Sequence, residues 1–291
     1  MVQAETTVTT VVITRDRRDD LLHSLAHHHG RVVVVDNASS DGTVAAVLGL
    51  GRADVRVVAL SRNAGATARN VGVRLARTPL VAFADDDSWW EPGALGRAAA
   101  LFARYPRLGL LAAHVLLEPS GRPDPVCDVM AASPLGSPGH LPGPEVLGFV
   151  ACAAVVRREA FLAAGGFDPV VFFAGEEERL AIDLASAGWG LAYAAEVVAH
   201  HRPARSRDPH PRRAAMIARN RLLTAVMRRP WTVVAQSVRR DLRGPATARA
   251  GAAAAVLRLP LALAWRRRVP AEVEQALRLL DAPLTPLGAV R

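Results

Sequence analysis

The chain of 291 residues contains no lysine, so all 36 of its basic side chains are arginines. It has only two cysteines, Cys127 and Cys152, which form neither a zinc-binding spacing nor a disulfide framework and fit a reducing compartment. The first residues lack a basic segment followed by an apolar one, so we expect no signal peptide. No apolar run approaches the roughly 18–20 residues that a membrane-spanning helix needs. These absences predict a cytoplasmic protein that does not span a membrane.

Charge is divided unevenly between two parts of the chain. Residues 1–201 contain 17 arginines and 22 acidic residues, whereas residues 202–291 contain 19 arginines and only five acidic residues. Hydrophobic residues make up 51% of the sequence, which is ample for a sizeable core. The change in charge therefore predicts a domain over residues 1–201 and a basic helical extension over residues 202–291 with a separate role.

Short apolar runs alternate with helix-like segments in the first hundred residues. The runs have the length of buried parallel strands and cover Val8–Ile13, Arg31–Val35, Val55–Leu60 and Leu80–Ala84. Segments with helical patterning lie between them at Asp19–His29, Thr43–Leu50 and Ala64–Ala76. This order predicts an α/β fold with a doubly wound sheet, in which ligands bind outside the carboxyl ends of the strands.

Fewer signals mark the remainder of the chain. A helix is predicted from Pro92 to about Tyr105, and a long loop rich in proline, glycine and serine over Glu118–Glu145. Regular structure is expected to resume at Val146–Arg157. Further helices are predicted at Arg158–Ala164 and Glu176–Ala187, a strand at Leu191–Ala199, and helices in the extension at Arg212–Arg228 and Ala250–Trp265.

Polar residues follow each of the four predicted strands, so we expect chemistry at this edge of the sheet. The four strand ends carry Thr14-Arg15, Asp36-Asn37, Ser61-Arg62-Asn63 and Asp85-Asp86-Asp87. Asp36 can accept a hydrogen bond from a base or a ribose, or it can form a turn with its own backbone. The three consecutive aspartates either cap a turn or hold a cation such as Mg²⁺ or Mn²⁺, which prefers oxygen ligands. In an extended segment Asp85 and Asp87 share a face, and Asp86 points elsewhere.

Six stretches, in order and spacing, resemble glycosyltransferase family 2. They are VVITRDR, VVVVDNASSDGT, LSRNAGATARNVGV, VAFADDDSWWEPGAL, GGFDPVVFFAGEEERLAIDLASAGW and VVAHH. The resemblance covers about residues 8–201, with a family-like RNRLL segment at Arg219–Leu223, and it is to rhamnosyltransferase-like bacterial members. It implies a GT-A fold and an inverting, metal-dependent enzyme. Such an enzyme moves a sugar from a nucleotide-diphosphate sugar to a hydroxyl of a glycan or lipid-linked acceptor.

The resemblance also implies roles for individual residues. It assigns Asp87 to a Mn²⁺ or Mg²⁺ ion on the donor diphosphate and places Asp85 nearer the ribose or the metal. A histidine at His200 or His201 completes the metal shell or contacts the diphosphate in the enzymes that this sequence resembles. The implied contacts with the nucleotide sugar fall on Thr14, Arg15, Asp36, Asn63, Arg69 and Asp85.

Inversion requires a general base that takes the proton of the acceptor hydroxyl. The family's Glu-Asp pair falls on Glu176 and Glu177, so a glutamate replaces the usual aspartate, and Arg179 stands where a later acid is usual. Glu177 is the candidate base and Glu176 the second candidate. The alternative is a helix start enriched in acidic residues, which its dipole favours. The replacement also leaves open a non-catalytic homologue that only binds a nucleotide sugar.

The basic extension has three interpretations. An interfacial segment, with apolar residues on one side and arginines reaching anionic headgroups, predicts association with the inner face of the cell membrane, and we favour it. Nucleic-acid binding is not expected, because no known reader motif supports it. The predicted helices could instead cover the acceptor side of the enzyme, and a basic membrane-associated adaptor without enzymatic activity is the remaining alternative.

Two aromatic clusters carry open assignments. Trp89 and Trp90 either stack on a sugar or pack beneath the aspartates, and we expect at least one of them in the core. The cluster His27-His28-His29 is assigned to the end of a helix rather than to a metal.

Overall fold

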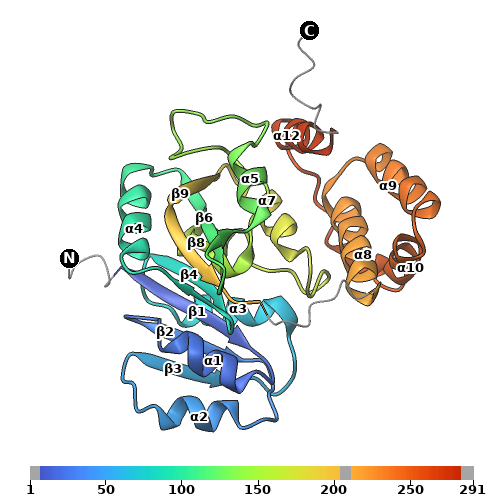
Figure 1. The fold of residues 1–291 in the computed structure, drawn as a ribbon. Helices are drawn as coiled ribbons and strands as arrows, with labels where there is room; N and C mark the ends of the chain where they lie inside the picture. Colours follow the sequence, from blue (N-terminus) through green and yellow to red (C-terminus); the bar gives the residue numbers. More distant parts are fainter. Residues whose placement is uncertain (1–6, 204–210, 283–291) are drawn as a thin grey trace.

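A mixed β-sheet forms the centre of the computed structural model, which describes residues 7–203 and 211–282 (Figure 1). The strand order is β3-β2-β1-β4-β8-β6-β9-β5, with β7 paired to β6. The parallel half consists of β1 (Val8–Thr14), β2 (Val32–Asp36), β3 (Val55–Ala59) and β4 (Leu80–Asp85). The other strands are β5 (Ser88–Trp90), β6 (Leu108–Leu117), β7 (Arg122–Pro123), β8 (Ala154–Arg157) and β9 (Gly190–His201). The predicted α/β class with a doubly wound sheet is confirmed.

Both faces of the parallel half are covered by helices, as the valines of β2 show. Successive side chains of a strand point to opposite faces. Val32 and Val34 pack in one cluster with Val47 of α2 (Thr43–Gly49) and the leucines of α1 (Arg18–Leu25). Val33 and Val35 belong to the main core on the other face, together with Val73 of α3 (Ala68–Leu75). The continuous apolar run of β2 is therefore buried on both faces of the sheet, as is typical of a parallel strand.

Further helices follow β5, and the last five form the C-terminal part (Figure 1). Those of the first part are α4 (Ala94–Arg104), α5 (Pro125–Ala131), α6 (Arg158–Ala163) and α7 (Glu176–Ser186), with short 3₁₀ helices at Gly65–Thr67 and Ala151–Ala153. The C-terminal helices are α8 (Pro211–Arg228), α9 (Trp231–Arg243), α10 (Ala246–Val256), α11 (Leu259–Ala264) and α12 (Ala271–Asp281).

The C-terminal helices pack against the sheet-containing part through two apolar contacts. Val170 and Val171 share a buried cluster with α8, and Val273 and Leu277 of α12 belong to the main core. The domain boundary after residue 201 remains a prediction, although the sheet does end at His201.

Several predicted elements differ from the structure. The prediction of a loop over Glu118–Glu145 is wrong, because this segment contains β7 and α5. Asp124 caps α5 by accepting a hydrogen bond from Val126 N, and Pro125 occupies the first turn, where its missing N–H costs nothing. Strand β6 has no counterpart among the predicted strands. The helix predicted from Pro92 begins at Ala94 instead, after Gly93 in the left-handed conformation.

The helix predicted over Ala250–Trp265 is also wrong in its extent. It is two helices, α10 and α11, which are separated at Leu257 and Arg258. Pro260 lies in the first turn of α11, the position at which proline is compatible with a helix start. Among the described residues, no helix combines the length and the hydropathy that crossing a membrane requires.

Gly72 provides a test of the packing beneath the site. A Cβ added there would lie 2.3 Å from Val11 Cγ1, so α3 would be forced away from β1. We expect Gly72→Ala to lower the free energy of unfolding by about 1–3 kcal/mol in urea titrations. Gly49→Ala is the matched control, because nothing lies within 4 Å of its added Cβ, and it should raise stability by about 0.5–1 kcal/mol. Equal effects of the two variants would contradict this packing.

Candidate active site

A cavity of about 300 Å³ opens at the carboxyl ends of β1 and β4. Residues from all four predicted strand ends or the turns after them line it, joined by residues from the segment before α7 and from α8. The lining residues are Ile13, Thr14, Arg15, Arg17, Asn37, Asn63, Gly65, Asp85, Asp86, Asp87, Phe172, Phe173 and Met216. The sequence-based expectation that polar groups meet at this edge is therefore confirmed.

The three aspartates do not alternate as an extended strand would. Strand β4 ends at Asp85, and Asp86 and Asp87 form the turn into β5, so all three border the same cavity. The prediction that Asp86 points elsewhere is wrong for this reason. Asp86 Oδ2 accepts a hydrogen bond of 3.0 Å from Thr14 Oγ1. Burial raises the pKa of Asp86 to about 7, against the opposing charge of Arg17.

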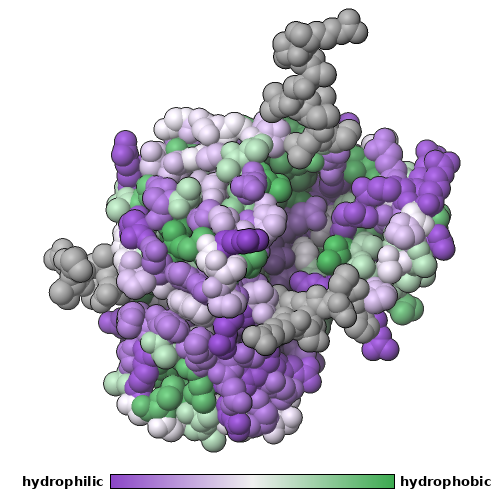
Figure 2. Space-filling view, in the orientation of Figure 1, coloured by the Kyte–Doolittle hydropathy of each residue, from purple (hydrophilic) through white to green (hydrophobic). Residues whose placement is uncertain are grey.

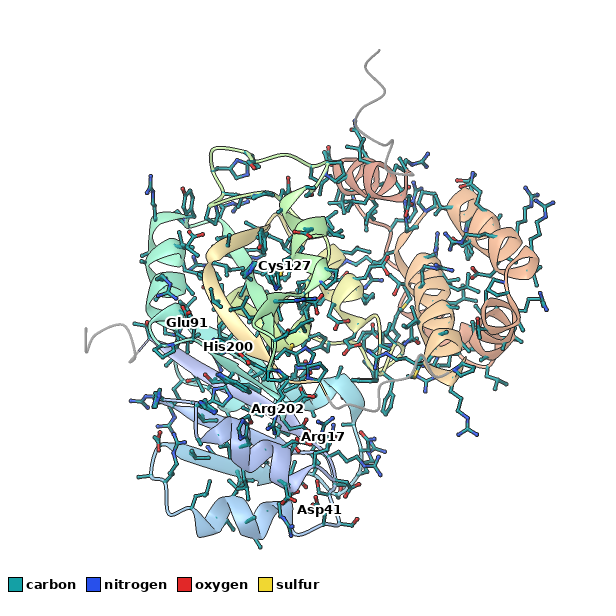
Figure 3. All side chains as sticks on the ribbon, viewed as in Figure 1. Arg17, Asp41, Glu91, Cys127, His200 and Arg202 are labelled. Carbon is teal, nitrogen blue, oxygen red and sulfur yellow. The ribbon has the colours of Figure 1, made fainter. Side chains whose placement is uncertain are left out.

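Arg17 balances part of this negative charge. Its Nε lies 3.1 Å from Asp86 Oδ1, and its Nη2 lies 3.2 Å from Asp87 Oδ2. The same guanidinium contacts Asp20, which also binds Arg202. Figure 3 shows Arg17 and Arg202 near each other. Arg17 was not among the predicted site residues, although it belongs to the VVITRDR stretch at the end of the first strand, and that position was the available signal.

His201 lies beside Asp87 because β5 pairs with β9. Ser88 is opposite His201 in this antiparallel ladder, and the peptide N–H of Arg202 donates to the carbonyl of Asp87. His201 Nε2 lies 3.4 Å from Asp87 Oδ1, and neither ring nitrogen of His201 has a hydrogen-bond partner within the described ranges. Asp87 and His201 thus place a carboxylate and an imidazole side by side, and a divalent cation such as Mn²⁺ can accept both together with phosphate oxygens.

His200 points to the other face of β9, so the structure does not bring it to Asp87. Its Nδ1 lies 2.8 Å from Glu118 Oε1, and its ring stacks on Trp89. His27 stacks on the same indole, with ring centroids 4.6 Å apart. Trp90 is buried in the main core, as expected for at least one of the two tryptophans.

The histidine cluster lies just beyond α1, which ends at Leu25. His28 is buried, and its Nε2 is 3.2 Å from the carbonyl oxygen of Ser88. Burial lowers the pKa of His28 to about 4, so the ring is neutral and joins the end of α1 to β5.

Arg69 is buried behind the cavity and does not line it. Its Nη2 lies 2.5 Å from Asp85 Oδ1, and its Nη1 lies 3.6 Å from Glu176 Oε1. Arg69 therefore joins the end of β4 to the start of α7 and keeps two carboxyl groups close together.

Glu176 and Glu177 begin α7 after Gly175, whose φ of 94° is accessible to glycine. Burial raises the pKa of Glu176 to about 7, with a further increase from the charge of Glu177 and an opposing effect of Arg69. Burial also raises the pKa of Glu177 above its usual value. A carboxylate with a raised pKa is a stronger base, which suits proton abstraction near neutral pH.

The remaining predicted residues lie around the cavity. Thr14, Arg15 and Asn63 line it, whereas Asp36 is buried next to the lining residue Asn37. Asp36 Oδ2 accepts a hydrogen bond from Ser39 N, and its Oδ1 has no hydrogen-bond partner in the described parts of the chain.

Gly65 has a structural reason to be glycine. The peptide N–H of Ala66 donates to the carbonyl of Phe172, and a Cβ on Gly65 would lie 2.5 Å from that oxygen. The Gly65 turn thereby fixes the Phe172–Phe173 segment at the mouth of the cavity. Phe172, Phe173 and Met216 were missed as site residues. Met216 carried no signal, because its position in the site depends on the docking of α8.

Comparison with known proteins decides the family. The model of the family described as Glycosyl transferase family 2 matches residues 11–163. The chain belongs to this family. It is 28% identical over 222 residues to N-acetylglucosaminyl-diphospho-decaprenol L-rhamnosyltransferase of Mycobacterium tuberculosis, a match that covers 63% of this chain and 71% of the relative.

Solved structures show the same fold. A mannosyltransferase from Pyrobaculum calidifontis in complex with GDP-Man and Mn²⁺ matches with a TM-score of 0.57 and 21% identity, covering 96% of this chain and 76% of that one. Residues 1–349 of S. aureus TarS in complex with UDP-GlcNAc match with a TM-score of 0.58 and 18% identity, covering 93% and 83%. The GT-A fold is confirmed, and this glycosyltransferase transfers a sugar from a nucleotide sugar.

Arg69 gives a prediction with a definite pH dependence. The pKa of Glu176 is raised in the folded state, so this carboxyl group favours folding at low pH and loses that contribution as the pH rises through about 7. Without Arg69, the ionised Glu176 has no buried cation beside it, so the free energy of unfolding decreases more as the pH rises. We expect Arg69→Gln to lower the free energy of unfolding by about 3–5 kcal/mol at pH 8 and by less at pH 5.

Arg97→Gln is the control for this variant, because Arg97 and Glu91 form a half-exposed pair. Chemical denaturation should show a change of about 0–1 kcal/mol for this variant at both pH values. A pH-independent effect of Arg69→Gln would contradict the proposed balance of charges.

Proposed function

We propose that this glycosyltransferase moves a hexose or deoxyhexose, with inversion, from a nucleotide-diphosphate sugar to a hydroxyl of a glycan or lipid-linked acceptor. The observation that supports it most is the position of Glu177, a half-buried carboxyl group in the first turn of α7 that interacts electrostatically with Asp85, which lines the cavity of the three aspartates. In this proposal Asp36 and Asn63 hold the nucleoside, with Thr14 and Arg15 in the same pocket. The mycobacterial relative, named a rhamnosyltransferase of a decaprenol-linked sugar, and the mannosyltransferase neighbour, solved in complex with GDP-Man, support this substrate class.

Asp87 and His201 would hold a Mn²⁺ or Mg²⁺ ion, with Asp85 at the end of β4 nearer the ribose or the ion. When bound, such an ion neutralises the charge that develops on the leaving diphosphate. Arg17 offsets part of the charge of Asp86 and Asp87, so the guanidinium lowers the repulsion within the turn. The mannosyltransferase neighbour was solved with Mn²⁺, which supports this assignment.

Glu177 would accept the proton of the acceptor hydroxyl as its oxygen attacks the anomeric carbon. Arg69 contributes by its charge, which favours the ionised forms of Glu176 and Glu177. Burial raises the pKa values of both carboxyl groups, which favours holding and releasing a proton closer to neutral pH.

Glu177→Gln tests the base directly. We expect kcat to fall by about 10²–10⁴-fold, because general-base assistance is lost, while the Kd for the donor stays unchanged. In the wild type, kcat/KM should decline on the acidic side with a midpoint above the ordinary glutamate value of 4.5, because burial raises the pKa of Glu177. The variant should lack this decline.

Glu178→Gln is the matched control, because this neighbour in α7 interacts with Arg229 of the C-terminal part. It should keep activity within a few-fold of wild type. Asp87→Ala should abolish the transfer that depends on Mn²⁺. If Glu177→Gln remained fully active, the base assignment would fail; if wild type bound donor but transferred and hydrolysed none, a non-catalytic homologue would be supported instead.

The C-terminal helices support peripheral association with the inner face of the cell membrane. Large apolar side chains are exposed on successive helices of this part, namely Leu242, Val256, Leu257, Leu261, Leu263 and Trp265. Figure 2 shows hydrophobic and strongly hydrophilic residues interspersed over these helices. Exposed apolar side chains next to arginines match the composition of interfacial membrane segments.

Leu257 is 87% exposed at the break between α10 and α11, so it is the best single test of this association. We expect Leu257→Asp to reduce co-flotation with vesicles that contain phosphatidylglycerol by several-fold, because a carboxylate opposes both insertion and the anionic surface. Leu48→Asp on α2 is the control, because Leu48 is also exposed but lies in the first part of the chain. Equal flotation of both variants and wild type would exclude this surface as the anchor.

A further inference from the structure

A second cavity, of about 390 Å³, lies where the C-terminal helices meet the sheet-containing part. It is bordered by the end of α6, by α7, and by the link between α11 and α12. Its charged lining residues are Asp168, Arg179, Asp183, Arg228, Arg267 and Arg268. None of them lines the cavity of the three aspartates, called the donor cavity below, so the two cavities are separate.

The two aspartates of this cavity are already neutralised. Asp168 Oδ2 binds Arg179, whose Nη1 also contacts Asp183. Asp183 Oδ1 accepts a hydrogen bond of 2.7 Å from Arg228 Nε. Arg179 and Arg228 thus balance both carboxylates and join α7 to the end of α8.

Two positive charges remain without a counterpart. The side chains of Arg267 and Arg268 are exposed at the cavity and form no hydrogen bond or ion pair with any side chain in the described ranges 7–203 and 211–282. Backbone hydrogen bonds hold this link in place, since Arg267 N donates to the Met227 carbonyl and Val269 N to the Arg228 carbonyl. The position of the two arginines is therefore set by the fold and does not depend on their charges.

Arg179 adds a buried donor to the same cavity. Its side chain is 4% exposed, and its Nε has no hydrogen-bond partner in the described part of the protein. Burial and the charges of Arg228 and Arg267 lower the pKa of Arg179 to about 9. A bound anion in the cavity would relieve the repulsion between these like charges.

We propose that this cavity binds the phosphate group of an amphiphilic ligand. Arginine guanidinium groups match phosphate oxygens in geometry as well as charge, and Arg267 and Arg268 would bind the group at the cavity mouth. Trp265 lines the same cavity and ends α11, whose Leu261 and Leu263 are exposed. An apolar tail on the phosphate would therefore lie along α11. The site requires neither the donor nor the sugar-transfer reaction.

The experiment is a calorimetric titration of the full-length protein with inorganic diphosphate in EDTA. Chelation removes divalent cations, so the aspartates of the donor cavity repel the anion. We expect saturable binding at one site, weakened at least about tenfold in the double variant Arg267→Gln/Arg268→Gln, because two charge-assisted contacts are lost. Arg239→Gln on α9 is the matched control: it removes an exposed arginine elsewhere in the C-terminal part and should leave the affinity unchanged.

Two further titrants distinguish the sources of the phosphate. Tighter binding of geranyl diphosphate than of inorganic diphosphate would assign the site to an isoprenoid-linked ligand. Tighter binding of short-chain phosphatidylglycerol would assign it to a membrane lipid headgroup. If wild type binds no titrant, if the double variant binds as tightly as wild type, or if an apolar tail adds no affinity, the proposal is overturned. Each outcome is independent of activity, so it is distinguishable from a failure of the proposed sugar transfer.

Discussion

Arg69 is buried between Asp85 at the end of β4 and Glu176 at the start of α7, and its charge allows two carboxyl groups to lie together in an enclosed site. Removing one partner of a buried pair leaves an uncompensated charge at a cost of about 3–5 kcal/mol. The sheet edge and α7 are far apart in the sequence, and this contact fixes their relation. The position of the candidate base depends on it.

Arg17 likewise places a positive charge between two carboxyl groups, those of Asp86 and Asp87. The two arginines differ in burial: Arg69 is enclosed, whereas Arg17 is partly exposed to the cavity. A phosphate-bound cation would bind in the same group of carboxylates that Arg17 contacts. The two arginines therefore offset part of the negative charge of the site before a donor arrives.

Much of the first part could be predicted from its pattern. Buried parallel strands leave continuous valine runs, and the doubly wound topology then brings Thr14, Asn37, Asn63 and the aspartates to one edge. The direction of Asp86 could not be predicted, because the strand period ends one residue earlier, at Asp85. Arg69 was expected at the nucleotide, and only the three-dimensional structure shows that it lies behind the cavity. Helix α5 was missed because the loop predicted over Glu118–Glu145 was judged by its proline and glycine content, whereas β6 lies before that loop in an apolar run that was assigned to no element.

The C-terminal helices show a different limit of sequence reasoning. Their basic and apolar composition was evident, but the break at Leu257 and the pairing of Arg228 with Asp183 depend on contacts between distant segments. Later residues of α7 border the arginine-lined cavity, whereas Glu176 in its first turn is joined through Arg69 to Asp85, which lines the cavity of the three aspartates.

In the proposed function, Asp87 and His201 belong to a cation site that the donor diphosphate completes. Titration of Mn²⁺ followed by electron paramagnetic resonance, with and without a nucleoside diphosphate, tests it most directly. We expect the nucleotide to tighten Mn²⁺ binding and Mn²⁺ to tighten nucleotide binding by the same factor. His201→Ala and Asp87→Asn should remove this coupling. Mn²⁺ affinity that is the same in all three proteins, with or without nucleotide, would contradict it.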